Sequence, residues 1–264
     1  MLGFIGTGNM ASAIIKGVIS SGFINGGEIC VFDKDTDKAK KLSEMYGVKA
    51  CESEKEVCEK AHQVILSVKP NVLESVFSAI KETLKEKNPL IISIAAGKSL
   101  SFLEEKADYK ARIIRVMPNI NAVVLEAISA YCENEFATEE DTLFAQKLLS
   151  AFGKAVRIDE DKFSVFTAIG GCSPAFTYMY IDALARAGVK NGLPKNIALE
   201  VAAQAVYGSA KMVAESSIHP YELVDRVCSP GGTTIEGVAS LQKDGFEAAV
   251  AAAVEAAINK DKRM

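Results

Sequence analysis

Up to about residue 158, short and continuous apolar runs alternate with longer stretches in which apolar positions recur at helical spacing. A continuous run such as Val64-Ile65-Leu66 predicts a strand that is buried on both faces. Because these runs alternate with helical stretches, the pattern predicts a doubly wound α/β sheet with crossover helices. The predicted strands cover residues 3–5, 29–32, 64–68, 90–94, 112–116, 128–132 and 155–158.

Two of the predicted helices in this half carry start signals. Ser53 and Glu56 have the spacing of a capping box, in which each side chain accepts a hydrogen bond from the other residue's backbone. Thr138 precedes three acidic residues, 139–141, which stabilise the positive end of a helix dipole. We therefore expect helices to begin after Ser53 and after Thr138.

Beyond residue 160 the strand-like runs stop, and alanine-rich segments with helical spacing follow. One segment has an apolar stripe with i, i+3, i+4, i+7 spacing, and Gly192 is expected to end that helix. Pro194 lies where a helix start tolerates proline. The stripe consists of Phe176, Met179, Tyr180, Ala183, Leu184 and Ala187.

The change of periodicity predicts two domains, an α/β domain at residues 1–159 and an all-helical domain at residues 160–264. The helical half has more apolar surface than its polar residues can cover. Exposed apolar surface of this kind marks an interface, and soluble oligomers are mostly symmetric assemblies of one chain. We therefore expect a homodimer that forms through the helical domain.

The strongest local motif is Gly6-Thr7-Gly8-Asn9-Met10-Ala11, which directly follows the first strand and opens a helix. In a dinucleotide-binding turn, Gly6 would permit the tight bend and Gly8 would let a pyrophosphate approach the backbone. Ala11 would allow close helix packing. The free N–H groups of the helix N-terminus favour an anion. The first domain is thus predicted to be a dinucleotide-binding domain of the Rossmann type.

The second predicted strand ends at Asp33, which is followed by Lys34. An acidic residue at this place binds the ribose hydroxyls of NAD, whereas a cation accepts the 2′-phosphate of NADP. An ordinary charged turn is the third interpretation. The motif therefore leaves open whether the cofactor is NADP(H) or NAD(H).

Two further strand ends carry unusual residues, Lys69-Pro70 and Ala95-Ala96-Gly97. Both belong at the carboxyl edge of the sheet, where open α/β sheets bind their ligands. The small residues would leave room for a flat ring. A surface lysine without a role is the alternative for Lys69.

In the helical half, Ser229-Pro230-Gly231-Gly232-Thr233-Thr234 precedes a helix that is expected near Ile235. Such a turn presents backbone N–H groups and three hydroxyls at a helix N-terminus, which suits a carboxylate. The alternative is a Pro-Gly turn with a threonine N-cap.

Composition narrows the function classes. The net charge of -4 gives no basic surface for nucleic acid, and no apolar run approaches the roughly 20 residues of a membrane helix. No secretory leader is expected, since a strand-like run directly follows Met1, so we expect a cytoplasmic protein. The six cysteines form no CxxC pair and the two histidines are far apart, which predicts no metal site.

Six motifs of the chain together resemble those of the pyrroline-5-carboxylate reductase family, and they occur in the same order and over nearly the whole chain. The resemblance implies a Rossmann domain, a helical substrate-binding and dimerisation domain, and reduction of Δ1-pyrroline-5-carboxylate to L-proline by NAD(P)H. It also allows for further assembly of dimers. The motifs are Phe4–Ala11, Val68–Pro70, Ala95–Gly97, Arg115–Asn119, Ala187–Pro194 and Ser229–Thr234.

The resemblance also assigns site residues. Glu160 lines up with an acidic position that contacts the substrate, and the 229–234 loop would hold the substrate carboxylate. The implied cofactor contacts are Ile5, Gly6, Thr7, Gly8, Asn9, Met10, Val68, Lys69, Pro70, Ile94, Ala95 and Ala96, beside Asp33 and Lys34 from the fingerprint, and the implied substrate contacts are Glu160, Ser229, Gly231, Gly232, Thr233 and Thr234.

The chain departs from the family in two places. Gly171-Cys172-Ser173-Pro174-Ala175-Phe176 stands where the family usually has Gly-Ser-Gly-Pro-Ala-Tyr. Glu54 replaces a frequent asparagine near the adenosine end of the cofactor, and many members lack an acidic residue at Asp33. The second departure argues against a strong preference for NADP.

The predicted mechanism is hydride transfer to a protonated C=N bond, with the Thr234 hydroxyl as hydrogen-bond partner of the ring nitrogen and Glu160 supplying negative potential. Two other functions remain open. One is a reductase of a related substrate, such as a 3-hydroxy acid or a six-membered cyclic imine. The other is a dinucleotide-sensing protein without turnover.

Overall fold

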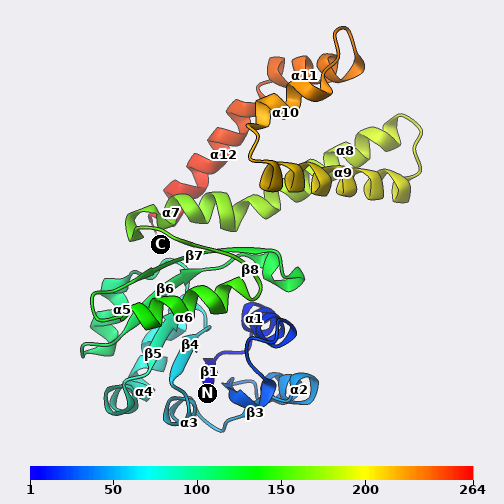
Figure 1. Ribbon diagram of the computed structural model, residues 1–264. Helices are drawn as coiled ribbons and strands as arrows, with labels where there is room; N and C mark the ends of the chain where they lie inside the picture. Colours follow the sequence, from blue (N-terminus) through cyan, green and yellow to red (C-terminus); the bar gives the residue numbers. More distant parts are fainter. Residues whose placement is uncertain (264) are drawn as a thin grey trace. The chain divides into compact units, whose positions relative to one another are not determined.

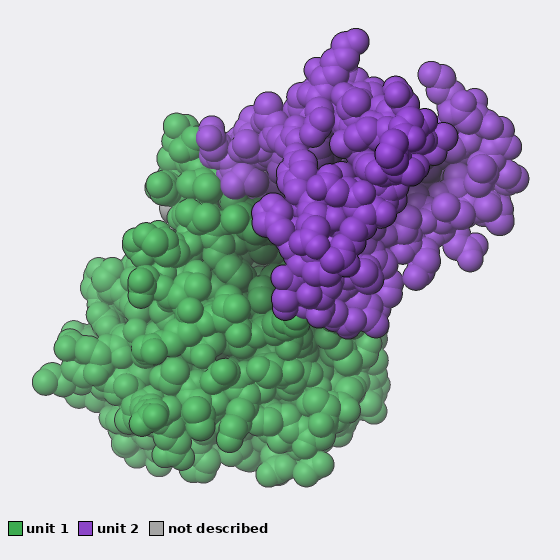
Figure 2. Space-filling view, turned by 45° about the horizontal axis from the view of Figure 1, so that its top comes forward, with its two compact units in different colours: residues 1–171, 258–264 green, residues 172–257 purple. Residues whose placement is uncertain are grey.

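The computed structural model describes residues 1–263, which form two compact units (Figure 2). The first unit comprises Met1–Gly171 and the C-terminal residues from Ile258, and the second comprises Cys172–Ala257. The units divide later than the domains predicted at residues 1–159 and 160–264, because short helices between residues 160 and 171 belong to the first unit. That domain boundary stays a prediction.

The first unit is built on one eight-stranded sheet with the strand order β3-β2-β1-β4-β5-β6-β7-β8 (Figure 1). The order reverses between β1 and β4, as in doubly wound folds. All seven predicted strands are present. They are β1 (Leu2–Ile5), β2 (Ile29–Phe32), β4 (Gln63–Leu66), β5 (Leu90–Ser93), β6 (Ile113–Met117), β7 (Ala127–Glu133) and β8 (Gly153–Arg157), with the short β3 (Lys49–Ala50) in addition.

The sheet is parallel except between β6 and β7, which pair antiparallel in the register Val116 to Tyr131. Only the 3-10 helix Ile120–Val124 lies between them. A parallel partner would need a crossover of a dozen residues or more, and this connection is too short for that. The predicted doubly wound sheet is therefore confirmed, and the antiparallel pair is a feature that the sequence did not predict.

Helices cover both faces of the sheet, and two apolar cores result (Figure 1). Side chains alternate along each strand: Phe4 faces one core and Ile5 the other. The first core is closed by α1 (Asn9–Ser20), α2 (Thr36–Tyr46) and α6 (Glu139–Ser150), and the second by α3 (Glu54–Lys60), α4 (Leu73–Lys87) and α5 (Leu100–Ala107).

Several shorter helical segments complete the first unit. They include the helical stretch after β8, where three short pieces of different helical type follow one another. The segments are the 3-10 helices Gly26–Glu28, Pro70–Val72, Ile120–Val124 and Glu160–Lys162, the α-helix α7 (Phe163–Phe166) and the π-helix Thr167–Cys172.

The predicted helix starts are present. Thr138 caps α6 with a complete capping box, because its hydroxyl accepts from the Asp141 N–H while Asp141 accepts from the Thr138 N–H. Ser53 caps α3 by accepting from the Glu56 N–H. The Glu56 carboxylate accepts from the Glu52 N–H instead of reaching back to Ser53. The Ser53 cap is thus confirmed as half of a capping box.

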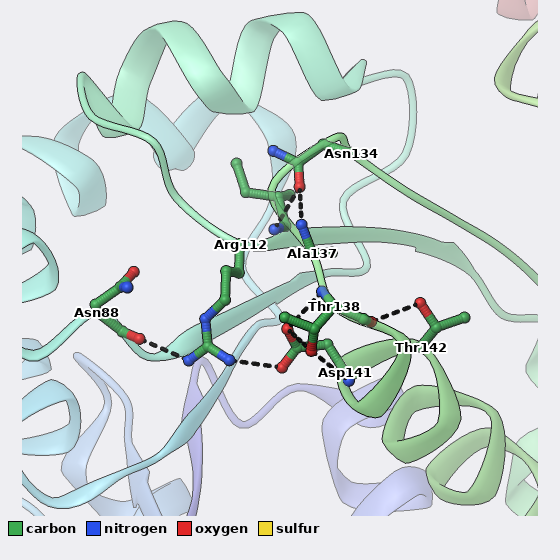
Figure 3. A network of polar contacts seen from close by, with 8 residues as sticks. Asn88, Arg112, Asn134, Ala137, Thr138, Asp141 and Thr142 are labelled. Carbon is green, nitrogen blue, oxygen red and sulfur yellow. Dashed lines mark hydrogen bonds and ion pairs between the residues drawn. The ribbon is translucent and has the colours of Figure 1, made fainter.

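A polar network fixes the start of α6 against the sheet (Figure 3). Arg112 donates to the Asp141 carboxylate at 2.8 Å and to the carbonyl of Asn88 at 2.7 Å. Asn134 accepts from the backbone N–H groups of Ile113 and Ala137 at 3.0 and 3.2 Å. These bonds join the ends of β6, β7 and α6, and two of the side chains that form them, Asn134 and Asp141, are buried.

The second unit consists only of helices, as predicted. The apolar stripe lies on α8, which ends two residues before Gly192, and the next helix starts directly after Pro194. Although α9 has 22 residues, neither it nor another helix of the described chain combines the length and apolarity of a membrane crossing. The helices are α8 (Ser173–Lys190), α9 (Lys195–Ser216), α10 (Pro220–Val227), α11 (Thr233–Lys243) and α12 (Phe246–Asp261).

This unit has almost no core of its own. Its small buried cluster contains only alanines, Ala185, Ala198 and Ala202. Large apolar side chains are open to solvent instead, among them Met179 at 73% exposure and Val201 at 58%. A helical unit without buried large side chains leaves its apolar faces without the burial that stabilises a fold.

Replacing Asp141 with alanine should lower the free energy of unfolding by about 3 kcal/mol, since Arg112 loses its partner and Thr138 loses half of its capping box. The exposed neighbour Glu140 is the matched control, and Glu140→Ala should change stability by about 0.5 kcal/mol or less. Denaturant unfolding followed by circular dichroism measures both. Equal losses in the two variants would contradict the role given to the network.

Candidate functional site

The glycine turn after β1 joins three neighbouring strand ends. The Gly6 N–H donates to the carbonyl of Phe32 at the end of β2 (2.8 Å), and the Ser67 N–H after β4 donates to the carbonyl of Ile5 (2.9 Å). The Ser67 hydroxyl also donates to the carbonyl of Gly6 at 2.7 Å. Gly6 has φ +96°, and a Cβ there would lie 2.7 Å from the Ser67 carbonyl oxygen. Only glycine fits this position without strain.

Gly8 has a different environment from Gly6. It is the N-cap of α1 with φ −67°, and an added Cβ would meet no atom within 4 Å. The first turn of α1 has neither a side-chain cap nor an acidic residue. Since its N–H groups are available, the start of α1 is an open site for an anion beside Gly8.

The carboxylate of Asp33 is held by the same turn. Its Oδ2 accepts from the backbone N–H of Thr7 at 2.7 Å and from the Thr7 hydroxyl at 2.9 Å, and its Oδ1 accepts from the Asp35 N–H at 2.9 Å. Partial burial acts to raise the pKa of Asp33, but these hydrogen bonds outweigh it and lower the pKa below the ordinary value. Asp33 is therefore a fixed anion at neutral pH.

A cavity of about 260 Å³ opens at these strand ends, where the strand order reverses. In doubly wound sheets this switch point is the usual place of ligand binding. The cavity brings together seven of the predicted cofactor contacts. They are Ile5, Gly6, Gly8, Asp33, Lys34, Val68 and Lys69.

The remaining predicted cofactor contacts lie elsewhere in the first unit. Thr7 is a buried residue of the turn itself, and its hydroxyl donates a hydrogen bond to Asp33. Asn9 lines a second cavity together with Lys16. Met10 and Ile94 pack against the first core, Pro70 begins a 3-10 helix, and Ala95 and Ala96 follow β5.

Sequence reasoning did not assign five residues that line the cavity. Ser67 carries the clearest signal, because a serine between the apolar β4 and the Lys69-Pro70 turn is well placed to bond the glycine turn. Glu54, which replaces a frequent asparagine of the family, lines the same cavity as Asp33. The full set is Phe32, Glu54, Ser67, Val72 and Val76.

Glu160 is engaged within the first unit. Its Oε1 accepts from the Leu100 N–H at 2.6 Å, at the start of α5, and from Arg115 at 2.8 Å. The Arg115 guanidinium lies 4.3 Å from the centroid of the Phe163 ring. Arg115 lies in the middle of β6, and a charged residue inside an otherwise apolar strand is the signal that could have identified it.

The 229–234 loop has a glycine cap. Gly232 is the N-cap of α11, and the helix begins at Thr233, so the alternative of a threonine N-cap was wrong. The Gly232 N–H donates to the carbonyl of Ser229 at 3.0 Å, and Gly231 has φ +68°. Thr233 and Thr234 are exposed, and the start of α11 has no side-chain cap. This arrangement can bind a carboxylate.

The cysteines offer no reactive group in the first unit. Cys30, Cys58 and Cys132 are buried and free, and burial raises the pKa of each thiol to about 12. A thiol with such a pKa is a poor nucleophile at neutral pH. These three residues act as small apolar side chains.

Two family models match the chain. Residues 160–264 match the model of pyrroline-5-carboxylate reductase dimerisation. Residues 1–97 match the model of NADP oxidoreductase, coenzyme F420-dependent. Together the matches cover the glycine turn and the whole helical half.

Two named relatives match this chain over its full length. The pyrroline-5-carboxylate reductase of Escherichia coli (strain K12) is 41% identical over 263 residues, which cover 100% of this chain and 97% of the relative. The enzyme of the same name from Arabidopsis thaliana is 40% identical, with 100% and 95% covered.

Two solved structures superpose on this chain over nearly its whole length. A pyrroline-5-carboxylate reductase from Coxiella burnetii superposes with a TM-score of 0.94 at 30% identity and covers 99% of this chain and 97% of its own. The pyrroline carboxylate reductase of Plasmodium falciparum, crystallised with NADP bound, superposes with a TM-score of 0.89 at 32% identity, with the same coverage.

The two glycines of the turn should respond differently to substitution. Gly6→Ala should lower the free energy of unfolding by about 2 kcal/mol or more, because of its positive φ and the Ser67 carbonyl. Gly8→Val should keep the stability within about 0.5 kcal/mol but fill the open space beside the start of α1, so dinucleotide affinity should be lost. Denaturant unfolding and fluorescence titration with NADPH measure these effects. Normal NADPH affinity in Gly8→Val would discredit the glycine-turn assignment.

Proposed function

Because this chain belongs to the pyrroline-5-carboxylate reductase family, we infer that it transfers hydride from NAD(P)H to the C=N bond of Δ1-pyrroline-5-carboxylate and thereby forms L-proline. Full-length identity of about 40% to proteins named pyrroline-5-carboxylate reductase is the observation that carries this conclusion. The reaction is the last step of proline biosynthesis.

The residues of the first unit fit a dinucleotide. Gly8 leaves open space beside the uncapped start of α1, where a pyrophosphate would find free N–H groups. Asp33 and Lys34 would flank the adenosine ribose, and Val68, Lys69 and Pro70 would follow the cofactor along the strand ends, with Ile94, Ala95 and Ala96 near its nicotinamide half. When bound, the cofactor supplies the hydride, which is the difficult part of the chemistry.

The chain's own residues would bind and orient the imino acid. We assign the carboxylate of the substrate to the 229–234 loop, where Ser229 and Thr233 offer hydroxyl donors and Gly231 and Thr233 offer N–H donors, with Gly232 as the N-cap of α11. Support comes from the glycine N-cap, which leaves these donors without a side-chain partner of their own helix.

Thr234 is the proposed catalytic residue. Its hydroxyl would form a hydrogen bond with the ring nitrogen, which must be protonated for the carbon to accept hydride readily. Glu160 would add negative potential near that cation, although its carboxylate also serves Arg115 and the start of α5. A hydrogen bond of this kind orients the ring for attack and stabilises the charge that it carries.

The dimerisation model that matches residues 160–264 supports a homodimer. The exposed apolar side chains of α8 and α9 support it independently, since Met179 and Val201 are more than half exposed in the single chain. Assembly of dimers into a larger oligomer and a cytoplasmic location stay predictions of the sequence.

Addition of Δ1-pyrroline-5-carboxylate to the protein with NADH or NADPH should cause loss of the nicotinamide absorbance and formation of proline. Thr234→Ala should lower kcat roughly a hundredfold, the scale of losing one hydrogen bond to a charged group in the transition state. Ser240→Ala removes an exposed hydroxyl from the same helix and should leave kcat unchanged.

Two results would be decisive against these assignments. A wild-type protein that binds both cofactors but oxidises neither in the presence of the imino acid would be a sensor and not a reductase. A folded Thr234→Ala protein with wild-type kcat would remove Thr234 from the mechanism.

A further inference from the structure

Asp33 is a fixed negative charge in the cavity at the strand ends, and we propose that it makes this enzyme select NADH over NADPH. The inference rests on the proposed function, because it takes that cavity as the adenosine end of the dinucleotide site. The two cofactors differ by the 2′-phosphate of that ribose, so the charges that line the cavity decide between them.

The Asp33 carboxylate cannot turn away from the cavity. Two of its three hydrogen bonds come from backbone N–H groups, those of Thr7 and Asp35, and the third comes from the Thr7 hydroxyl. The Thr7 N–H belongs to the glycine turn itself, so moving Asp33 would disturb that turn. A 2′-phosphate would therefore meet this carboxylate wherever the rest of the cofactor lies as proposed.

The same carboxylate is suited to a ribose that carries both hydroxyls. A carboxylate has about four acceptor positions, and the three hydrogen bonds leave capacity for a hydroxyl donor. Because the hydrogen bonds lower the pKa of Asp33 in spite of its partial burial, the group is ionised at neutral pH and accepts but does not donate. It would attract a hydroxyl and repel a phosphate.

The remaining charges of the cavity do not reverse this preference. Glu54, half-buried in the lining of the same cavity, adds a second carboxylate, and Lys34 and Lys69 bring two positive charges. Both lysines are exposed, and their flexible, hydrated side chains gain little from an ion pair in water. Lys38 is paired with Asp35 at 3.2 Å. A fixed, partly desolvated anion thus outweighs mobile cations.

The test is direct titration of the protein with NADH and with NADPH, followed by nicotinamide fluorescence in the absence of imino acid. The wild-type Kd for NADH should be lower than that for NADPH by about tenfold or more, the scale of repulsion between charges a few ångströms apart near a surface. Asp33→Asn should bring the two Kd values closer together or reverse their order, because it strengthens the binding of NADPH and weakens the binding of NADH.

Glu54→Gln is the second variant, because Asp33→Asn disturbs a hydrogen-bonded turn and can reduce folding. It should strengthen NADPH binding by a larger factor than NADH binding, because only NADPH carries the 2′-phosphate. Glu44→Gln, an exposed carboxylate on α2, is the matched control for net charge and should leave both Kd values as they are. Added salt should bring the wild-type Kd values for NADH and NADPH closer together, since it screens the repulsion between Asp33 and the 2′-phosphate.

The inference is overturned if the wild-type protein binds NADPH as tightly as NADH or more tightly. It is also overturned if neither Asp33→Asn nor Glu54→Gln changes the ratio, or if the preference for NADH grows with salt. Binding of both cofactors without preference contradicts this inference alone, whereas binding of neither contradicts the proposed function as well.

Discussion

The contact between the backbone of Gly6 and the carbonyl of Ser67 is the constraint on which the rest of the site depends. It holds the ends of β1 and β4 so close that a single Cβ at residue 6 would lie 2.7 Å from the Ser67 oxygen. The Ser67 hydroxyl and the Phe32 carbonyl bond the same turn from the two neighbouring strands. Because the turn is fixed, the N–H groups at the start of α1 and the partners of Asp33 are fixed with it.

Asp33 both stabilises this turn and contributes a charge to the cavity beside it. The hydrogen bonds that stabilise the turn are the ones that keep the carboxylate ionised and fixed in the lining of the cavity. A residue that serves both purposes cannot be exchanged without effect on the fold. In the proposed site, the choice of cofactor is therefore tied to the local structure and does not rest on a free surface charge.

The second unit follows another principle. Its helices bury only small side chains and expose large ones, so their stability depends on burial that the single chain does not supply. A second copy of the chain provides that burial in the proposed dimer. Its glycine-capped helix α11 differs from α3, α5 and α6, whose starts are capped by Ser53, Ser99 and Thr138. A glycine cap leaves donors for a ligand where a side-chain cap would use them.

The sequence by itself determined the strands, the glycine turn and the helical second half, because periodicity and glycine or proline positions act locally. It did not determine β3, whose two residues Lys49 and Ala50 are exposed and too few for a pattern, nor the antiparallel pairing of β6 with β7. Only the tertiary structure decided that Thr7 holds Asp33 and that Glu160 meets Arg115. These partners are 26 and 45 residues apart in the chain, and hydrogen bonds over such separations depend on how the strands are ordered in the sheet.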